Sequence, residues 1–180
     1  MLHDKIQTNG PAENYIVATA RQEIEYLRRL YGKATDLLGL IGDAGAKQQA
    51  TEIYHQIFNP GVQIRVTGGA EPLIGGSPTD WIEVVSKALG PYESTQHLIG
   101  TQVVTFEAIE FNNTPVSISS GRASMTSYLQ AWHVWPDRRL RVVMGTYVDE
   151  VEFNPKVGWQ ITDMNLVYTA TEHRMLDQPT

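Results

Sequence analysis

The stretch GTYVDEVEFNPKVGWQITDMNL (145–166) decides the fold class of this chain. Apolar and polar residues alternate on both sides of FNPKVG (153–158), which is rich in turn-forming residues. Alternation with a period of two is typical of a strand that buries one face. We therefore expect a hairpin of two antiparallel strands here.

The same alternation extends outward from this hairpin over most of the second half of the chain. A shorter strand, VQIRVTG (62–68), is expected before the long ones. Strands well beyond the usual length of about five or six residues must twist, coil or bend at bulges. A curled sheet with helices on its concave side encloses a pocket that suits a small ligand. The four long strands are predicted at about 94–110, 116–135, 139–153 and 158–171, and turn-rich joins (NNTP, WPDR and FNPKVG) connect them.

Helical periodicity marks the N-terminal part of the chain. From about Glu13, apolar residues recur at steps of three and four, which predicts a long helix with a bend or break at Gly32 or Gly39. AKQQATEIYHQIF (46–58) predicts a second helix, and a serine cap, a proline and a glycine stop predict a third over 79–89. Helices followed by hairpin-linked strands indicate an α+β fold with a mostly antiparallel sheet.

Composition restricts the classes of function. The 180 residues are 42% hydrophobic and 19% charged, as in an ordinary globular protein, and the net charge of −6 argues against nucleic-acid and anionic-membrane partners. The absence of cysteine excludes disulfides, thiolate catalysis and cysteine-ligated metals. No apolar run suits a signal peptide or a membrane span, so a cytoplasmic location is expected. We expect a flexible N-terminal tail (1–12), a single domain (13–171) and a C-terminal tail (172–180).

Two histidines, His97 and His133, lie in the middle of predicted strands among apolar residues. Such a histidine is either a core residue with a satisfied hydrogen bond or a proton-transfer group. By alternation His97 shares a face with Val103, and His133 shares a face with Met125 while Trp132 points the opposite way. If the two strands pair through the NNTP join, both rings can reach one pocket. The other histidines, expected in solvated or surface positions, are His3, His55 and His173.

Other kinds of site find weak support in the sequence. The two mid-strand histidines lack the short spacing of metal-binding pairs, and no carboxylate follows either one at the fourth position, so no metal site is predicted. The loop GGAEPLIGG (68–76) matches neither phosphate-binding glycine motif and reads as a mobile flap or a plain loop. No serine or threonine has the context of a catalytic nucleophile.

Three segments carry a resemblance to a known family. YGKATD (31–36), TQHLIG (95–100) and the closing G-x-Y-x-D/E segment before G-W-x-I resemble the nuclear-transport-factor-2-like superfamily. Within it the chain resembles the SnoaL-like, polyketide-cyclase branch, which includes scytalone dehydratase and the bile-acid 7α-dehydratases. The resemblance covers about residues 13–170 and implies a cone-shaped α+β barrel in which N-terminal helices pack on a strongly curved sheet around a pocket. Fold alone does not choose among the superfamily's dehydratases, isomerases, cyclases, hydrolases and binders.

The resemblance also implies site residues. The dehydratases' catalytic histidine maps onto His97, their first-helix carboxylate onto Asp36 after Tyr31, and a second polar group onto His133, where the spacing is longer in this chain. The tyrosine that scytalone dehydratase has on its first strand is absent from VQIRVTG, and a terminal basic residue of the bile-acid enzymes has no clear counterpart. On an ideal helix, side chains five apart point about 140° from one another. Tyr31 and Asp36 therefore share a pocket only if Gly32 relaxes the helix or its end reaches over the pocket mouth.

These residues imply a cofactor-independent dehydratase acting on a cyclic, hydrophobic hydroxy-carbonyl compound of polyketide, steroid or terpenoid type. His97 is expected to act as general base, Asp36 to orient it, Tyr31 to donate to the enolate oxygen, and His97 or His133 to protonate the departing hydroxyl. An isomerase or cyclase with the same base, or a non-catalytic binding module, remain the alternatives.

Two further expectations concern the residues that line the pocket and the residues on the outer face of the sheet. Met125, Phe106 and Trp132 are candidates to enclose the substrate, although core packing explains them equally well. Members of the superfamily pair through the outer sheet face, and Val104 and Phe106 near Gln102 are compatible with such a homo-oligomeric contact.

Overall fold

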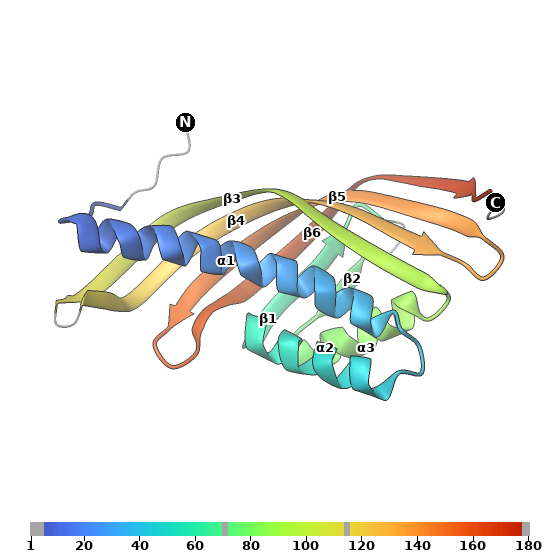
Figure 1. The fold of residues 1–180 in the computed structure, drawn as a ribbon, viewed down its shortest axis with the longest axis horizontal. Coiled ribbons are helices and arrows are strands. Elements are labelled where there is room, and N and C mark those ends of the chain that lie inside the picture. The colour runs from blue at the N-terminus through green and yellow to red at the C-terminus, as the bar shows by residue number, and fades with distance from the viewer. Residues whose placement is uncertain (1–5, 70–71, 114–115, 178–180) are drawn as a thin grey trace.

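The computed structural model describes residues 6–69, 72–113 and 116–177, and these form three helices on one face of a curved six-stranded sheet (Figure 1). This is the α+β architecture predicted, and the sheet curls without closing. The helices are α1 (Pro11–Leu38), α2 (Ala44–Ile57) and α3 (Pro78–Leu89). The strands are β1 (Phe58–Thr67), β2 (Leu73–Gly75), β3 (Ser94–Asn113), β4 (Val116–Val134), β5 (Arg139–Asn154) and β6 (Gly158–Met175).

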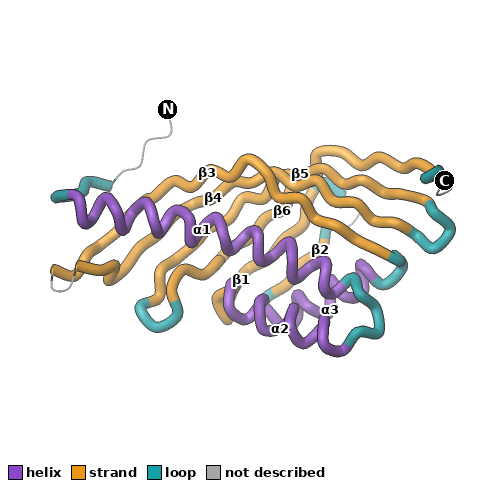
Figure 2. The backbone as a smooth tube through the Cα atoms, viewed as in Figure 1, coloured by secondary structure: helices purple, strands orange, loops and turns teal. Residues whose placement is uncertain are grey.

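The strand order is β2-β1-β6-β5-β4-β3, with antiparallel neighbours except for the parallel pair β1–β6. The three hairpins that the turn-rich joins predicted account for the β3 to β6 half of the sheet. Figure 2 shows α1 running across the concave face of these strands, while α2 and α3 gather beside β1 and β2. None of the helices in the described part of the chain is long and apolar enough to cross a membrane.

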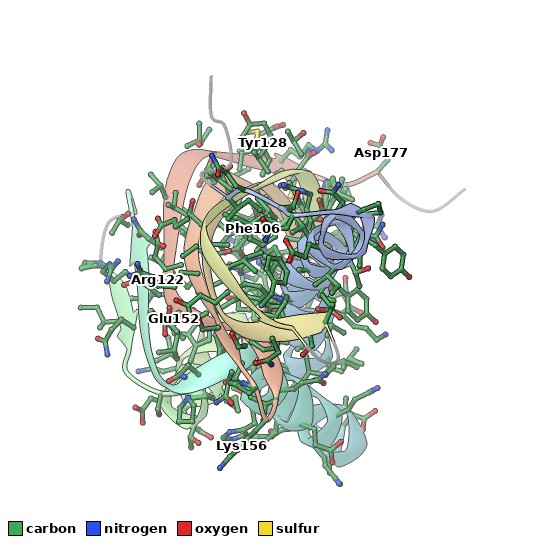
Figure 3. The ribbon with its side chains drawn as sticks, turned by 90° about the vertical axis from the view of Figure 1, so that its left-hand side faces the viewer. Phe106, Arg122, Tyr128, Glu152, Lys156 and Asp177 are labelled. Atoms are coloured by element: carbon green, nitrogen blue, oxygen red, sulfur yellow. The ribbon has the colours of Figure 1, made fainter. Side chains whose placement is uncertain are left out.

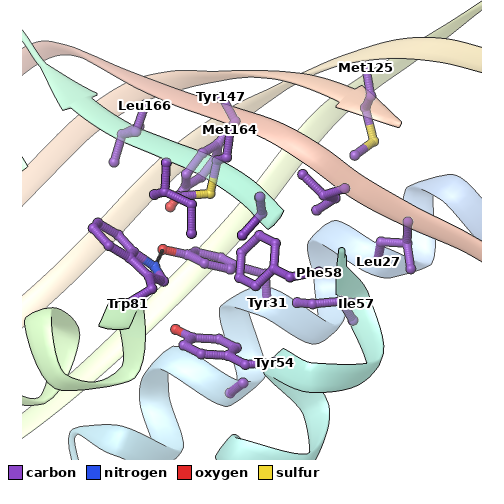
Figure 4. Close-up of a cluster of buried hydrophobic side chains, with 14 of the residues drawn as sticks. Leu27, Tyr31, Tyr54, Ile57, Phe58, Trp81, Met125, Tyr147, Met164 and Leu166 are labelled. Carbon is purple, nitrogen blue, oxygen red and sulfur yellow. Dashed lines mark hydrogen bonds between the residues drawn. The ribbon is translucent and has the colours of Figure 1, made fainter. Parts of the chain in front are cut away.

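The apolar stripe of α1 forms the centre of the core, as its periodicity predicted. The almost completely buried positions of this stripe are Ala20, Ile24, Leu27, Tyr31, Ala34 and Leu38. Figure 4 shows Tyr31 and Leu27 of this stripe together with Tyr54, Ile57 and Phe58 from the α2–β1 segment and with strand residues above them.

The helix is not broken at Gly32, because α1 continues to Leu38 and ends at Gly39. Gly32 instead allows close packing: a Cβ atom there would lie 3.3 Å from Ile99 Cγ1 and 3.6 Å from the Cβ of His97. Gly39 caps the helix, and a Cβ atom there would lie 2.5 Å from Thr95 Oγ1. The two glycines therefore let the last turns of α1 approach β3.

A β-bulge between Gly100 and Val103 changes which side chains of β3 face the core. At the bulge Thr101 takes a φ of 39°, in the left-handed region. Val103 is 43% exposed, whereas Val104 and Phe106 are buried. The predictions that Val103 shares the face of His97, and that Val104 and Phe106 point outward, are wrong for this reason. Figure 3 shows Phe106 inside the curve of the sheet and Tyr128 outside it.

The ends and loops differ from the expectations in detail. β6 continues to Met175 and pairs with Arg139 of β5, so the predicted C-terminal tail begins with strand. Part of the predicted flap, Leu73–Gly75, is strand β2, paired with β1. Residues 1–5 of the predicted N-terminal tail, residues 70–71 of the flap and residues 114–115 of the NNTP join lie outside the described residues.

Candidate active site

The last turn of α1 brings the carboxylate of Asp36 against the ring of His97 on β3. Asp36 Oδ1 lies 2.7 Å from His97 Nδ1, and Oδ2 accepts a 3.0 Å hydrogen bond from the His97 backbone N–H. The hydroxyl of Thr95 donates to Oδ1 at 3.2 Å. A carboxylate only accepts hydrogen bonds, so a neutral His97 ring keeps its proton on Nδ1 and leaves Nε2 as the nitrogen that can accept one.

This contact explains how Tyr31 and Asp36 can both act on one cavity from different faces of an uninterrupted helix. Asp36 does not need to point into a cavity, because it holds His97, and His97 lines the cavity. Tyr31 reaches the cavity directly. On its outer side Asp36 borders a surface groove with Arg29 and Lys33, where its side chain is 28% exposed.

The cavity behind His97 has a mostly apolar and aromatic wall. Its volume is about 80 Å³, below the roughly 300–1,000 Å³ of typical ligand pockets, so a cyclic ligand requires side chains to move apart. The polar and aromatic groups at the wall come from every layer of the fold. They are Tyr31 and Thr35 of α1, Trp81 of α3, Tyr92 of the α3–β3 loop, His97 of β3, His133 of β4, Arg141 and Tyr147 of β5 and Tyr168 of β6.

His133 lies beside His97, as the pairing of β3 with β4 allows. The ring centroids are 5.5 Å apart and the rings meet edge to face. Burial, followed by the nearby His97 and Arg141, lowers the pKa of His133 to about 4. The Nδ1 atom of His133 is buried without a hydrogen-bond partner among the described residues. His133 is therefore a neutral imidazole at neutral pH, able to exchange hydrogen bonds with a ligand but not to carry a standing charge.

Tyr31 is a protonated phenol held in an aromatic cluster. Its hydroxyl accepts a 3.2 Å hydrogen bond from Trp81 Nε1, and its ring stacks on Tyr54 with centroids 5.5 Å apart (Figure 4). Burial raises the pKa of Tyr31 above its ordinary value, partly offset by the Arg28 guanidinium. The proton therefore stays on the oxygen at neutral pH.

The three side chains expected to enclose a substrate lie elsewhere. Met125 and Phe106 are fully buried in the core, where Phe106 packs on Trp159 with centroids 5.9 Å apart. Trp132 is on the sheet face opposite His133, as alternation itself implies. None of the three is among the described residues that line the cavity.

Sequence reasoning missed the cavity residues that come from distant elements, above all Arg141 and Tyr92. The charged side chain of Arg141 in an otherwise apolar run of β5 was a signal that could have been used. Its meaning depends on the register that places Arg141 directly opposite His133. Among the described residues no group of three or more histidine or acidic side chains could hold a metal ion.

The family model described as the SnoaL-like domain matches residues 17–165 of this sequence. No curated protein sequence matches at a significant level.

Several solved structures share the fold. The Kfla4162 protein of Kribbella flavida has a TM-score of 0.65 at 20% identity, covering 87% of this chain and 95% of that one. A provisionally named scytalone dehydratase of Novosphingobium aromaticivorans has a TM-score of 0.64 at 14% identity, covering 93% and 94%. Hexachlorocyclohexane dehydrochlorinase LinA-type3 of Novosphingobium barchaimii has a TM-score of 0.67 at 10% identity, covering 92% and 99%. The family match over most of the chain shows that the chain belongs to the SnoaL-like domain family, and its fold is that of a nuclear-transport-factor-2-like protein.

Proposed function

We propose that this protein is a cofactor-independent dehydratase that eliminates water from a cyclic, hydrophobic hydroxy-carbonyl compound. The observation that carries the proposal is the 2.7 Å contact between Asp36 Oδ1 and His97 Nδ1, with His97 at the wall of an aromatic cavity. An imidazole oriented by a carboxylate is a general base whose proton-accepting nitrogen is fixed in place.

The reaction needs one base, one donor and one leaving group. His97 Nε2 takes the proton from the carbon next to the carbonyl, and the electron pair of that C–H bond moves to form an enolate. The Tyr31 hydroxyl donates a hydrogen bond to the enolate oxygen. The enolate then expels the β-hydroxyl group, which leaves as water with the proton from His97, and an α,β-unsaturated carbonyl remains. Asp36 stabilises the imidazolium that exists between the two steps.

The relatives support elimination as the reaction class. Two structural neighbours carry the names of a dehydratase and a dehydrochlorinase, which denote loss of water and loss of hydrogen chloride. An isomerase or cyclase would use the same base without losing water, and a binding module would need only the cavity.

A homo-oligomer and a cytoplasmic location complete the proposal. The outer face of the sheet carries a hollow of about 500 Å³ lined by Leu98, Tyr128, Met144 and neighbouring residues. Leu98 and Tyr128 are exposed there, so they replace Val104 and Phe106 as the candidate contact residues between copies.

The test is turnover of cyclic β-hydroxy ketones by the His97→Ala variant. Loss of a positioned general base lowers the rate about 10²–10⁴-fold, so we expect the variant to be nearly inactive. His55→Ala, an exposed histidine on α2, is the matched control and keeps full activity. Mass spectrometry identifies the reaction, because dehydration removes one water from the substrate mass and isomerisation leaves it unchanged. Equal turnover by the wild type and His97→Ala would refute the proposal.

A further inference from the structure

Arg141 on β5 is a cation in the cavity wall that has no acidic partner within the part of the chain that the structure describes. Its Nη1 donates to the Tyr92 hydroxyl at 3.2 Å, and its Nε is buried without a hydrogen-bond partner. Among the described residues no carboxylate lies within ion-pair distance of it, in contrast to Arg28 and Arg65, which pair with aspartates. A buried donor without an acceptor is destabilising, so a ligand that supplied an acceptor to Nε would be favoured here.

The neighbours of Arg141 do not supply a negative charge. His133 on β4 and His173 on β6 lie directly opposite Arg141 in the sheet register, and a histidine is neutral or positive. Asp36, whose charge reaches His133, is already engaged by the His97 ring and Thr95. The wall at Arg141 is therefore electropositive, next to an apolar interior.

We propose that Arg141 binds a carboxylate, so that the ligands of this cavity are cyclic acids rather than neutral compounds. The Nε–Nη2 edge of the guanidinium has no partner in the described residues and presents two parallel donors, the geometry that a planar carboxylate accepts. The hydrogen bond to Tyr92 holds the third nitrogen and fixes the plane of the group. A single guanidinium matches the single charge of a carboxylate.

The inference deepens the proposed function, on which the identity of the ligand as substrate rests. The binding of the anion does not depend on catalysis. Arg141 acts as a specificity residue: it selects acids over their neutral analogues and orients them at one end of the cavity, with His97 and Tyr31 contacting the same cavity from β3 and α1.

The test uses benzoate and its uncharged isostere benzamide as probes. Dissociation constants are measured by NMR titration of the wild type, Arg141→Met and Arg174→Met at one ionic strength. Arg174, on the exposed end of β6, is the matched control for loss of one positive charge. We expect the wild type and Arg174→Met to bind benzoate at least about tenfold more tightly than benzamide, and Arg141→Met to lose this preference. The proposal is overturned if Arg141→Met still prefers benzoate. It is also overturned if the wild type shows no preference for benzoate, which includes the case in which it binds neither probe.

Two further measurements keep the result interpretable. If Arg141→Met does not fold, Arg141→Lys keeps the charge without the planar fork, and we expect its preference for benzoate to fall several-fold; an unchanged preference overturns the proposal. In the folded wild type, benzoate bound at Arg141 offsets the charge that lowers the pKa of His133, so the His133 ring titrates at higher pH in its presence, and an unmoved titration contradicts the site.

The outcome is separable from that of the proposed function. His97→Ala is expected to lose turnover and to keep the preference for benzoate. If His97→Ala keeps turnover while Arg141→Met loses the preference, the dehydratase proposal fails and the carboxylate site stands. If His97→Ala loses turnover while Arg141→Met keeps the preference for benzoate, the carboxylate site fails and the dehydratase proposal stands.

Discussion

Two of the acid–base contacts between helix α1 and the sheet differ in exposure. Arg28 pairs with Asp149 on β5, and both side chains are 0% exposed. Asp36 pairs with His97 on β3, with side chains 28% and 8% exposed. The first pair is sealed between the rings of Tyr31 and Tyr147, whose centroids lie 4.6 and 3.9 Å from the guanidinium carbon. The Asp36–His97 pair lies between the cavity, which His97 lines, and a surface groove, which Asp36 borders.

The difference shows how one helix provides both an anchor, Arg28, and the carboxylate that holds the proposed base, Asp36. In the sealed pair, burial raises the pKa of Asp149, and the Arg28 charge and hydrogen bonds oppose that rise. Neither partner can reach a ligand, so the pair fixes α1 on the sheet. In the open pair, Asp36 fixes the ring of His97 while its other nitrogen remains accessible. The two pairs therefore differ in solvent and ligand access, and this difference separates a structural ion pair from the pair that we propose to be catalytic.

Breaking the sealed pair is expected to have the largest effect on stability. Asp149→Ala leaves the Arg28 guanidinium buried and unpaired, which costs about 3–5 kcal/mol of unfolding free energy. Urea denaturation measures the loss. The control is Asp163→Ala, which breaks the partly exposed pair with Arg65 and costs less than about 1 kcal/mol. Similar losses in the two variants would contradict the distinction drawn here.

Lowering the pH tests whether His133, which lines the same cavity as His97, is buried as a neutral ring. Because the folded-state pKa of His133 is lowered to about 4 from 6.5, the unfolded chain takes up the proton first as the pH falls. Its contribution to stability is present above pH 6.5 and is lost between 6.5 and about 4, by about 3 kcal/mol in total.

His133→Gln removes this titration. We expect the wild type to lose about 3 kcal/mol more than the variant between neutral pH and pH 4, measured by denaturation at each pH. Parallel curves for the two proteins would show that His133 is not buried as a neutral ring.

Asp36→Asn separates orientation from stability in the open pair. Asparagine keeps the shape of the side chain but removes the charge that stabilises the imidazolium, so turnover is expected to fall about 10²-fold. The unfolding free energy is expected to change by less than about 1 kcal/mol, because the group is partly exposed. Asp177→Asn, at the exposed C-terminal end, is the control. A large loss of stability with unchanged turnover would assign Asp36 the role of Asp149.

The smallest expected effect comes from Gly39→Ala. The new Cβ atom would lie 2.5 Å from Thr95 Oγ1, so the Thr95 hydroxyl must rotate away and its bond to Asp36 is lost. One such bond contributes about 1 kcal/mol, and turnover falls by several-fold as the carboxylate loosens. Thermal unfolding and kinetics are compared with Gly76→Ala, where nothing lies within 4 Å. Unchanged values in Gly39→Ala would mean that Thr95 does not hold the carboxylate.

Local patterns predicted the element types well. The period of two in 145–166 and the turn-rich joins located β3 to β6, and the stripe on α1 identified its buried face. Each of these signals depends on neighbours within a few residues, so the sequence exposes them directly. The same signals put His97 and His133 mid-strand in apolar surroundings.

The sequence by itself therefore determined the helices, the long antiparallel strands and the candidate histidines. Only the tertiary structure decided that the bulge at Thr101 turns Val104 and Phe106 inward, and that register places Arg141 beside His133. It also decided that Asp36 reaches His97 across two glycine contacts of α1. The physical reason is that a bulge, a register and a helix-to-strand contact depend on pairing between residues far apart in the chain, which no local periodicity encodes.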